Sequence, residues 1–245
     1  PTVTDCTFSG NTAYYDGGGM YNDGSNPAVN NCTFSRNSAV ISGGGMNNIY
    51  SSSPVVTNCV FWGDSPDEIA IRAAPFPIPS APTIRFSDVE GGLPVDAIDG
   101  GGNIDLDPMF IRLPDPGPDG AWDGVDDDYG DLRLRPSSPC IDAGDPGFLA
   151  QTGETDLEGH ARVLCEYVDM GAYEFGIGDY DCDQTIDLTD FAAWNACMTG
   201  PLDSGAFHST IDIRQSTIDC EAFDFDGDGF VDLTDFAAFQ RIIGP

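Results

Sequence analysis

The chain has 245 residues, 41 of them acidic and nine basic, and its formal net charge is −32 at pH 7. Such a surface repels nucleic acid and anionic membranes, because both are bound through basic side chains, and it attracts cations. No apolar run approaches the roughly 18 residues that a membrane span needs. We therefore expect no nucleic-acid partner and no membrane insertion, and we expect divalent metal ions to be bound.

The N-terminal third is internally repetitive. One phrase recurs around Cys6, Cys32 and Cys59, and a second, Gly-Gly-Gly-Met, recurs at 17–20 and 43–46 with the same period. Each unit is a set of short alternating runs separated by Asn, Asp and Gly, the residues that tolerate sharp bends. A unit this short cannot bury its apolar face alone, but coils stacked about 4.8 Å apart share a continuous core. The period therefore predicts a parallel β-helix, a mainly β solenoid, over residues 1–99.

These repeats resemble the right-handed β-helix repeats of large bacterial surface and secreted proteins, including the polymorphic outer-membrane type. The resemblance covers about residues 1–90, with a degenerate fourth copy around Ser87, and it implies that the intact parent protein extends further on its N-terminal side. Two columns of equivalent residues are interpreted as structural, a ladder of buried thiols and a bend ladder hydrogen-bonded along the coil axis: Cys6, Cys32 and Cys59, and Asp5, Asn31 and Asn58.

The period is lost over residues 100–176. Phrases at 103–110, 131–145 and 168–175 resemble the C-terminal closing segment of bacterial β-helices. A solenoid must end in an atypical unit, because its last coil otherwise exposes apolar surface and an unpaired strand edge. We therefore expect an irregular cap here. Cys140 and Cys165 could form a disulfide across it, but sequence alone does not give their separation and leaves this open.

One acidic stretch of the cap, residues 115–128, is similar in spacing to a calcium loop. Its acidic residues at relative positions 1, 5, 9 and 12 offer four metal ligands: Asp115, Asp119, Asp123 and Asp126. Position 3 is Gly117, which has no side-chain oxygen. The alternative is a solvated acidic turn, and both interpretations stay open.

Residues 177–245 contain one acidic loop-plus-helix unit twice. A calcium loop of about 12 residues supplies oxygens from positions 1, 3, 5, 7, 9 and 12, and both copies place Asp at all of these except position 7, where a backbone carbonyl serves. The predicted calcium ligands are Asp179, Asp181, Asp183, Thr185, Asp187 and Asp190 in loop one, and Asp224, Asp226, Asp228, Phe230, Asp232 and Asp235 in loop two. The apolar residues at position 8, Ile186 and Val231, are expected to tie the loops together, and apolar residues at i, i+3 and i+7 after each loop predict a helix.

This region resembles type I-like dockerins, over about residues 178–245. The resemblance implies calcium-dependent docking onto a cohesin domain through loop positions 10 and 11, which are Leu188, Thr189, Leu233 and Thr234. Gln184 departs from the pattern, because Gly normally occupies position 6 to allow a positive φ, and we expect a cost of about 1 kcal/mol there. The copies are separated by an insertion, 202–219, which a Cys197–Cys220 disulfide is expected to close, leaving Cys182 over.

Together these features predict a secreted or cell-surface bacterial protein without catalytic activity, in which a rigid β-helix is assembled or anchored through its dockerin. The expected partners are a cohesin-like domain or other copies of the same protein. The alternative is a carbohydrate-binding or polysaccharide-degrading β-helix attached through the dockerin, for which Tyr14, Tyr15 and Tyr21 are local glycan-binding candidates. Catalysis on a β-helix needs a cluster of carboxylates or a basic residue on one face, whereas the repeats place Cys, Phe, Ser, Thr and Asn in register.

Overall fold

A computed structural model describes residues 1–72, 79–122, 124–176, 178–179, 181–187, 189–190, 211–212, 223, 225, 230–231 and 233–243. The chain forms two compact units. Unit 1 contains residues 1–149 and 167–173, and unit 2 contains residues 150–166 and 174–245. The predicted cap, 100–176, is thus divided between the two units. None of the helices in the described part of the chain is long and apolar enough to cross a membrane.

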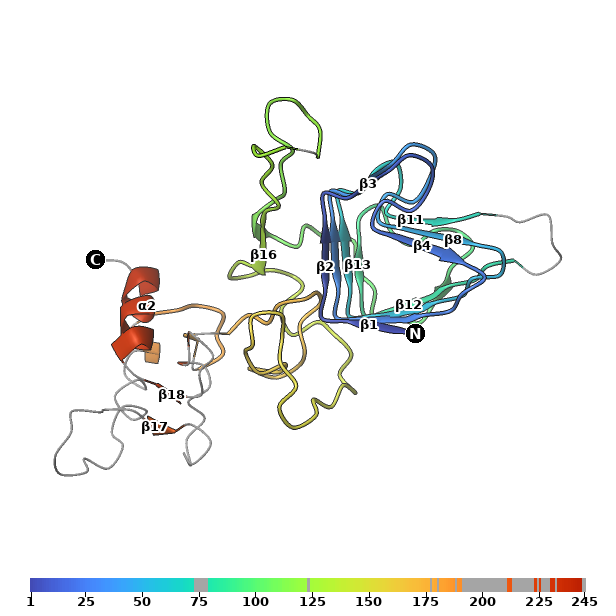
Figure 1. Ribbon diagram of the computed structural model, residues 1–245. Coiled ribbons are helices and arrows are strands. Elements are labelled where there is room, and N and C mark those ends of the chain that lie inside the picture. The colour runs from blue at the N-terminus through green and yellow to red at the C-terminus, as the bar shows by residue number, and fades with distance from the viewer. Residues whose placement is uncertain are drawn as a thin grey trace, which may run out of the picture. The chain divides into compact units, whose positions relative to one another are not determined.

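Unit 1 is a parallel β-solenoid whose coils have three main walls (Figure 1). The first wall is a five-stranded sheet of β1 (Thr2–Thr4), β5 (Ala28–Asn30), β9 (Val55–Thr57), β12 (Thr83–Arg85) and β14 (Ile98–Asp99). The second is a four-stranded sheet of β2 (Thr7–Ser9), β6 (Thr33–Ser35), β10 (Val60–Trp62) and β13 (Asp88–Val89). The third contains β4 (Met20–Asp23), β8 (Met46–Ile49) and β11 (Ile69–Ile71), and β3 (Thr12–Ala13) pairs with β7 (Ser38–Ala39) at one corner.

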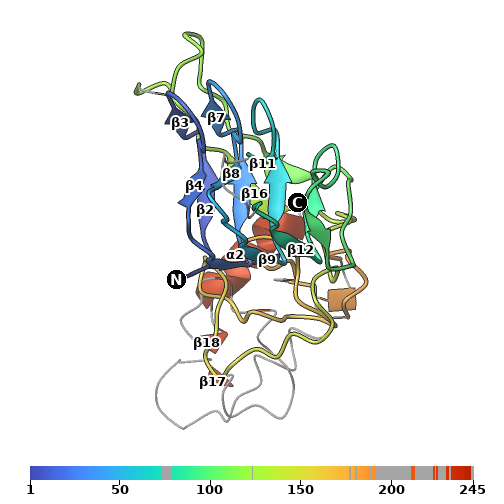
Figure 2. The ribbon, with the colours of Figure 1, turned by 90° about the vertical axis from the view of Figure 1, so that its right-hand side faces the viewer.

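Strand pairing follows the sequence period and confirms the predicted fold. Val3 lies opposite Val29, which lies opposite Val56, and all pairs within the three walls are parallel. Figure 2 shows the successive coils side by side. The degenerate fourth copy is a true coil, since β12 and β13 extend the first two walls.

Inside the solenoid, equivalent apolar residues stack in columns. The rings of Phe8, Phe34 and Phe61 lie nearly parallel, with centroids 4.5 and 4.4 Å apart. Cys32 and Cys59 are fully buried unpaired thiols of the same core, as predicted, whereas Cys6 of the first coil is only half-buried. Ser87 continues the cysteine column, and its hydroxyl accepts a hydrogen bond from the backbone N–H of Cys59 at 3.1 Å.

The bend between the first two walls carries the predicted ladder, which we call the Asn58 ladder (Asp5, Asn31 and Asn58). All three residues have positive φ, 50° to 54°. The Asn31 amide donates to Asp5 at 3.1 Å, and the Asn58 amide donates to Asn31 at 3.0 Å. These bonds run along the coil axis, and the prediction of a structural bend ladder is confirmed.

The irregular part of unit 1 closes the last coil and also covers one wall. Residues 98–106 form a partial further coil, in which β14 pairs with β12 and Ile104 bridges to Asp88. Farther along, β15 (Phe110–Arg112) and β16 (Asp131–Leu134) form an antiparallel pair. The stretch 167–173 returns to the second wall, where the N–H of Gly171 donates to the carbonyl of Asn58 at 2.9 Å and that of Ala172 donates to the Thr33 hydroxyl at 3.0 Å.

Unit 2 contains few regular elements in its described part: β17 (Ile211–Asp212), β18 (Phe230–Val231) and α2 (Leu233–Ile243). The turn-rich segment 150–166 is organised around Asp156, whose carboxylate accepts backbone N–H groups of Glu158 and His160 at 2.9 Å and of Glu174 at 3.1 Å. Arg162 in this segment is fully buried, and its guanidinium pairs with Glu174 at 3.0 Å. Helix α2 ends at Ile243, just before Gly244-Pro245, and confirms the helix predicted after loop two.

Candidate metal centre

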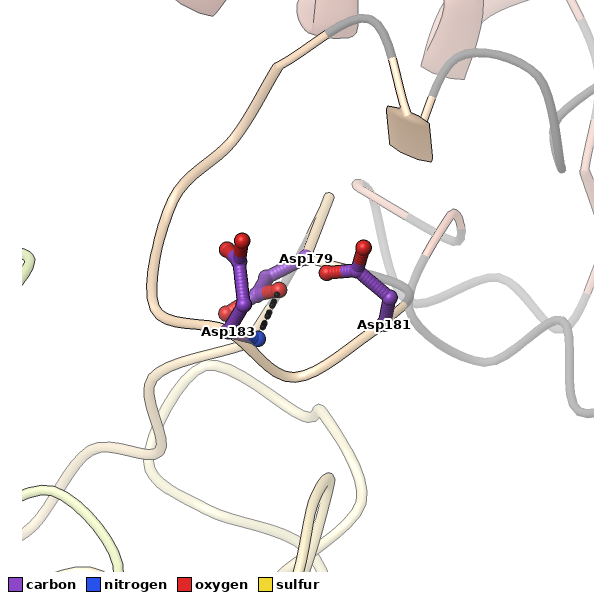
Figure 3. Close-up of side chains that lie close together, drawn as sticks. All are labelled: Asp179, Asp181 and Asp183. Atoms are coloured by element: carbon purple, nitrogen blue, oxygen red, sulfur yellow. Dashed lines mark hydrogen bonds between the residues drawn. The ribbon is translucent and has the colours of Figure 1, made fainter.

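Three carboxylates converge in loop one. One oxygen atom each of Asp179, Asp181 and Asp183 lies within 4.8 Å of the other two. Figure 3 shows these three side chains close together in the loop. They are the alternate residues at positions 1, 3 and 5 that the sequence predicts as calcium ligands. Among the described residues, no other group of three His, Cys, Asp or Glu side chains converges in this way.

The loop backbone is wrapped around the two carboxylates at its ends. Asp179 accepts the N–H groups of Asp183 at 3.2 Å and Gln184 at 2.9 Å. Asp190, which is fully buried, accepts those of Asp181 at 3.4 Å and Asp187 at 2.7 Å. Positions 1 and 12 therefore hold the loop closed, and Asp179 at position 1 also belongs to the convergent group with Asp181 and Asp183.

Electrostatics favour a cation at that centre. Burial, together with the charge of Asp190, raises the pKa of Asp179 to about 6. Burial and the neighbouring charges of Asp183 and Asp190 also raise the pKa of Asp181. A divalent ion would remove this repulsion, because an opposite charge within a few ångströms favours ionised carboxylates. The donors offered are all oxygens, which fits calcium and not a thiolate- or imidazole-seeking metal.

Two residues of loop one adopt left-handed backbone conformations. Gln184, at position 6, has φ 66°, the conformation that a Gly would normally supply. Cys182, at position 4, has φ 57° and forms a disulfide with Cys165, the Cα atoms being 5.8 Å apart. The disulfide ties loop one to the segment 150–166. The prediction of a Cys140–Cys165 disulfide is wrong, because Cys140 is a buried free thiol that donates to Asp88 at 3.3 Å. The prediction that Cys182 is left without a disulfide partner is also wrong, because Cys182 is bonded to Cys165.

Loop two is described at only a few positions. Asp235, at position 12, is buried and accepts the N–H of Phe225 at 2.7 Å. Phe225 and Phe223 contact the ring of Phe239 in α2, with centroids 6.0 Å from it in both cases. Val231 is buried, and β18 pairs with Ile211–Asp212 of the insertion.

Several predicted site residues lie outside the described part of the chain. They are Asp224, Asp226, Asp228 and Asp232 of loop two, Leu188 of the docking pair, Asp123 of the acidic stretch, and the Cys197–Cys220 pair. Thr185, Asp187 and Thr189 of loop one are exposed. Phe230 lies in β18, and Leu233 and Thr234 begin α2.

The acidic stretch 115–128 forms a hairpin-like loop without converging carboxylates among its described residues. Asp115 pairs through its backbone with Asp128, and its carboxylate accepts the N–H of Gly117 at 2.9 Å. Asp119 likewise accepts the N–H of Ala121 at 2.9 Å. Because Asp115, Asp119 and Asp126 are not brought together as metal ligands, the structure favours the solvated turn.

Comparison with known families gives a match at each end of the chain. A model of the right-handed β-helix region matches residues 1–74, and a model of the dockerin type I domain matches residues 177–244. The protein is a β-helix repeat protein with a C-terminal dockerin. Dockerin type I domains bind calcium, and the convergent carboxylates of loop one in this dockerin are consistent with that. Searches among curated proteins and among solved structures find no match.

The dockerin is joined to elements that its own motif does not predict. The segment 150–166 belongs to the same compact unit, and the Cys165–Cys182 disulfide and the burial of Arg162 secure it. The one sequence signal available was the odd cysteine inside loop one, because a secreted chain seldom leaves a thiol at such an exposed position.

Proposed function

We propose that the protein is a non-catalytic structural or adhesive component of an extracellular or cell-surface assembly, held in place by docking of its dockerin onto a cohesin-like domain in the presence of calcium. The dockerin match and the convergence of Asp179, Asp181 and Asp183 carry this proposal. Dockerins bind cohesins, and proteins that contain them are typically extracellular or at the cell surface.

The β-helix serves in this proposal as a rigid spacer or display surface. The hydrogen bonds that the polar side chains form between coils support this role. Asn residues in the strands and at the bends bond to the equivalent residues of the next coil, as Asn22 of β4 does to Asn48 of β8 at 2.9 Å, so they maintain the stack. Polar side chains that are hydrogen-bonded in such ladders are not free to act on a substrate, as those of a catalytic face would have to be.

Docking is tested by binding of the full chain to immobilised cohesin domains with calcium and after chelation. We expect binding only with calcium, and we expect Asp181→Asn to weaken it strongly, since it removes one of three convergent charges. Asp119→Asn is the matched control, because Asp119 is an exposed carboxylate outside the dockerin. A combined change of Thr189→Ala and Thr234→Ala separates recognition from calcium binding, because the ligands stay intact.

Other outcomes would point elsewhere. Calcium binding without capture by any cohesin, together with large calcium-dependent particles in light scattering, would replace the cohesin with other copies of the chain. Retention on glycans would favour the carbohydrate-binding alternative. The observation behind that alternative is the pair Tyr14 and Tyr15, which are 76% and 65% exposed and meet edge to face on the solenoid surface, as sugar-stacking rings do.

A further inference from the structure

A second polar ladder of the solenoid ends in a carboxylate. In the Asn37 ladder (Asn11, Asn37 and Asp64), the Asn11 amide donates to Asn37 at 2.8 Å and the Asn37 amide donates to Asp64 at 2.9 Å. The backbone N–H of Asn37 also donates to the same Asp64 oxygen, Oδ1, at 2.6 Å. An ionised Asp cannot donate to the next coil as an Asn would, so the ladder stops in the third coil.

Two more carboxyl groups meet Asp64 at this point. Glu68 lies beside it, and Glu68 Oε1 accepts the backbone N–H of Asp64 at 2.9 Å. The Glu68 carboxyl is in contact with the carboxyls of both Asp64 and Glu90, the latter from the fourth coil. Glu90 in turn accepts the N–H of Gly63 at 2.8 Å. We call Asp64, Glu68 and Glu90 the coil carboxylates.

The buried oxygens of this group lack a donor. Asp64 and Glu68 are each only 8% exposed, and neither Asp64 Oδ2 nor Glu68 Oε2 has a hydrogen-bond partner among the described residues. Burial raises the pKa of both groups. Arg36 lies over Gly63, yet among the described ion pairs none joins it to the coil carboxylates.

A cavity of about 490 Å³ opens at the coil carboxylates. Asp64, Glu68 and Glu90 line it together with the exposed Asp67 and the turn of Gly91 and Gly92. Gly91 and Gly92 have φ 75° and 82°, and a side chain at either would meet nothing within 4 Å, so the mouth of the cavity is open. Water and a small ion can therefore enter the cavity and reach the exposed Glu90, whereas Asp64 Oδ2 and Glu68 Oε2 themselves expose almost no surface.

We propose that the coil carboxylates bind a divalent cation, calcium being the natural choice, which links the third coil to the fourth independently of the dockerin loops. Hard carboxylate oxygens, one of them contributed by a different coil, suit calcium, and water in the cavity completes the coordination shell. The ion supplies what the ladder lacks at Asp64, a positive partner for acceptors that no Asn amide reaches. The three carboxyls do not converge as those of loop one do, so binding requires the exposed Glu90 side chain to move inward and the Asp64 and Glu68 side chains to turn toward the ion. The competing occupant is a proton shared by Asp64 and Glu68.

The test is calcium stoichiometry of the full chain, measured by titration calorimetry and by metal analysis after dialysis. In a background of Asp181→Asn and Asp226→Asn, which weakens both dockerin loops, we expect at least one calcium ion to remain bound per chain. Adding Glu68→Gln should remove it or weaken it at least tenfold, whereas Asp23→Asn, an exposed carboxylate of the first coil, should not. Because Glu90 is exposed and its change cannot disturb the core, Glu90→Gln provides the same test if Glu68→Gln fails to fold.

The outcomes decide between ion and proton. Loss of the remaining calcium in Glu68→Gln and Glu90→Gln but not in Asp23→Asn supports the site. A dockerin-deficient chain that binds no calcium overturns it, and so does an affinity unchanged by Glu68→Gln and Glu90→Gln. The shared proton then remains as the partner of the two buried oxygens. None of these results depends on whether a cohesin is bound, so docking and the coil site can fail separately.

Discussion

The coil bends and calcium loop one build tight turns from the same residue types, yet they satisfy the side-chain oxygens in opposite ways. In the Asn58 ladder each carboxamide both donates and accepts, so the oxygens of Asp5 and Asn31 receive a donor from the next coil. In loop one the equivalent positions are Asp, which accept only, and three carboxylates converge without a side-chain donor. Exchanging Asn for Asp thus turns a self-sufficient bend into one that requires a cation. The coil carboxylates lie in the solenoid but follow the second pattern.

Removing calcium should destabilise loop one far more than the coil bends of the Asn58 ladder, and this is the largest effect that we expect. Loop one contains five carboxylates, and their mutual repulsion should unfold the dockerin when the ion is withdrawn, whereas the Asn58 ladder needs no ion. Hydrogen exchange with and without a chelator should show lost protection at residues 178–190 and unchanged protection at β1, β2, β5 and β6, which lie away from the coil carboxylates. Equal loss in the two regions would contradict the comparison. Restoring calcium provides the control for irreversible damage.

The disulfide is the second device that holds loop one. The Cys165–Cys182 bond closes a separation of 17 residues, for which loop-closure entropy gives about 3 kcal/mol. We expect Cys165→Ser with Cys182→Ser to lower the free energy of unfolding of unit 2 by about that amount in denaturant titrations at saturating calcium. The matched control is Cys6→Ser, an unpaired and half-buried thiol of the solenoid. An unchanged midpoint for unit 2 in the double variant would show that calcium alone suffices.

Contacts within a repeated sequence pattern could be predicted, whereas contacts between segments that share no repeat could not. The 26- to 27-residue spacing placed Asp5, Asn31 and Asn58 in one column, and the 12-residue spacing placed Asp179, Asp181 and Asp183 in one loop. In both cases the neighbours in space are neighbours in a short repeating pattern. The Cys165–Cys182 bond and the pairing of β17 with β18 join segments that share no period, so local sequence carried no information on their separation. The same spacing aligns Asp64 with Asn11 and Asn37, but only the structure shows that Glu68 and Glu90 lie beside it.

A single exchange inside the ladder tests the donor argument directly. Asn58 is 1% exposed, donates to Asn31 and accepts the N–H of Asp145 at 2.7 Å. Asn58→Asp retains the acceptor but places two acceptors face to face, and we expect the solenoid to lose about 1–3 kcal/mol of stability, the cost of a buried unsatisfied group. Asp5→Asn, at the accepting end of the same ladder, keeps its acceptor and should change stability by less than about 0.5 kcal/mol. Similar denaturation midpoints for the two variants would refute the donor argument.

The smallest expected effect concerns Asp156, which is satisfied in a third way, by backbone N–H groups and a histidine. Burial alone would lower the pKa of His160, but the neighbouring Asp156 outweighs it and raises that pKa. Burial alone would raise the pKa of Asp156, and the bonds from His160 and from backbone N–H groups outweigh it and lower that pKa. Because the pKa of His160 is raised on folding, its contribution is complete below about pH 6.5 and is lost as the pH rises through the folded-state pKa.

This pH dependence is measured as the melting temperature of unit 2 between about pH 6 and 9, the range around the histidine pKa, at saturating calcium so that the dockerin carboxylates stay ionised. The wild-type protein should lose stability with rising pH relative to His160→Gln, which keeps a polar side chain but does not titrate. Parallel curves for the two proteins would mean that the Asp156 carboxylate is satisfied by its backbone donors alone. In that case Asp156 resembles Asp190 of loop one, a carboxylate held by N–H groups, and the histidine adds only packing.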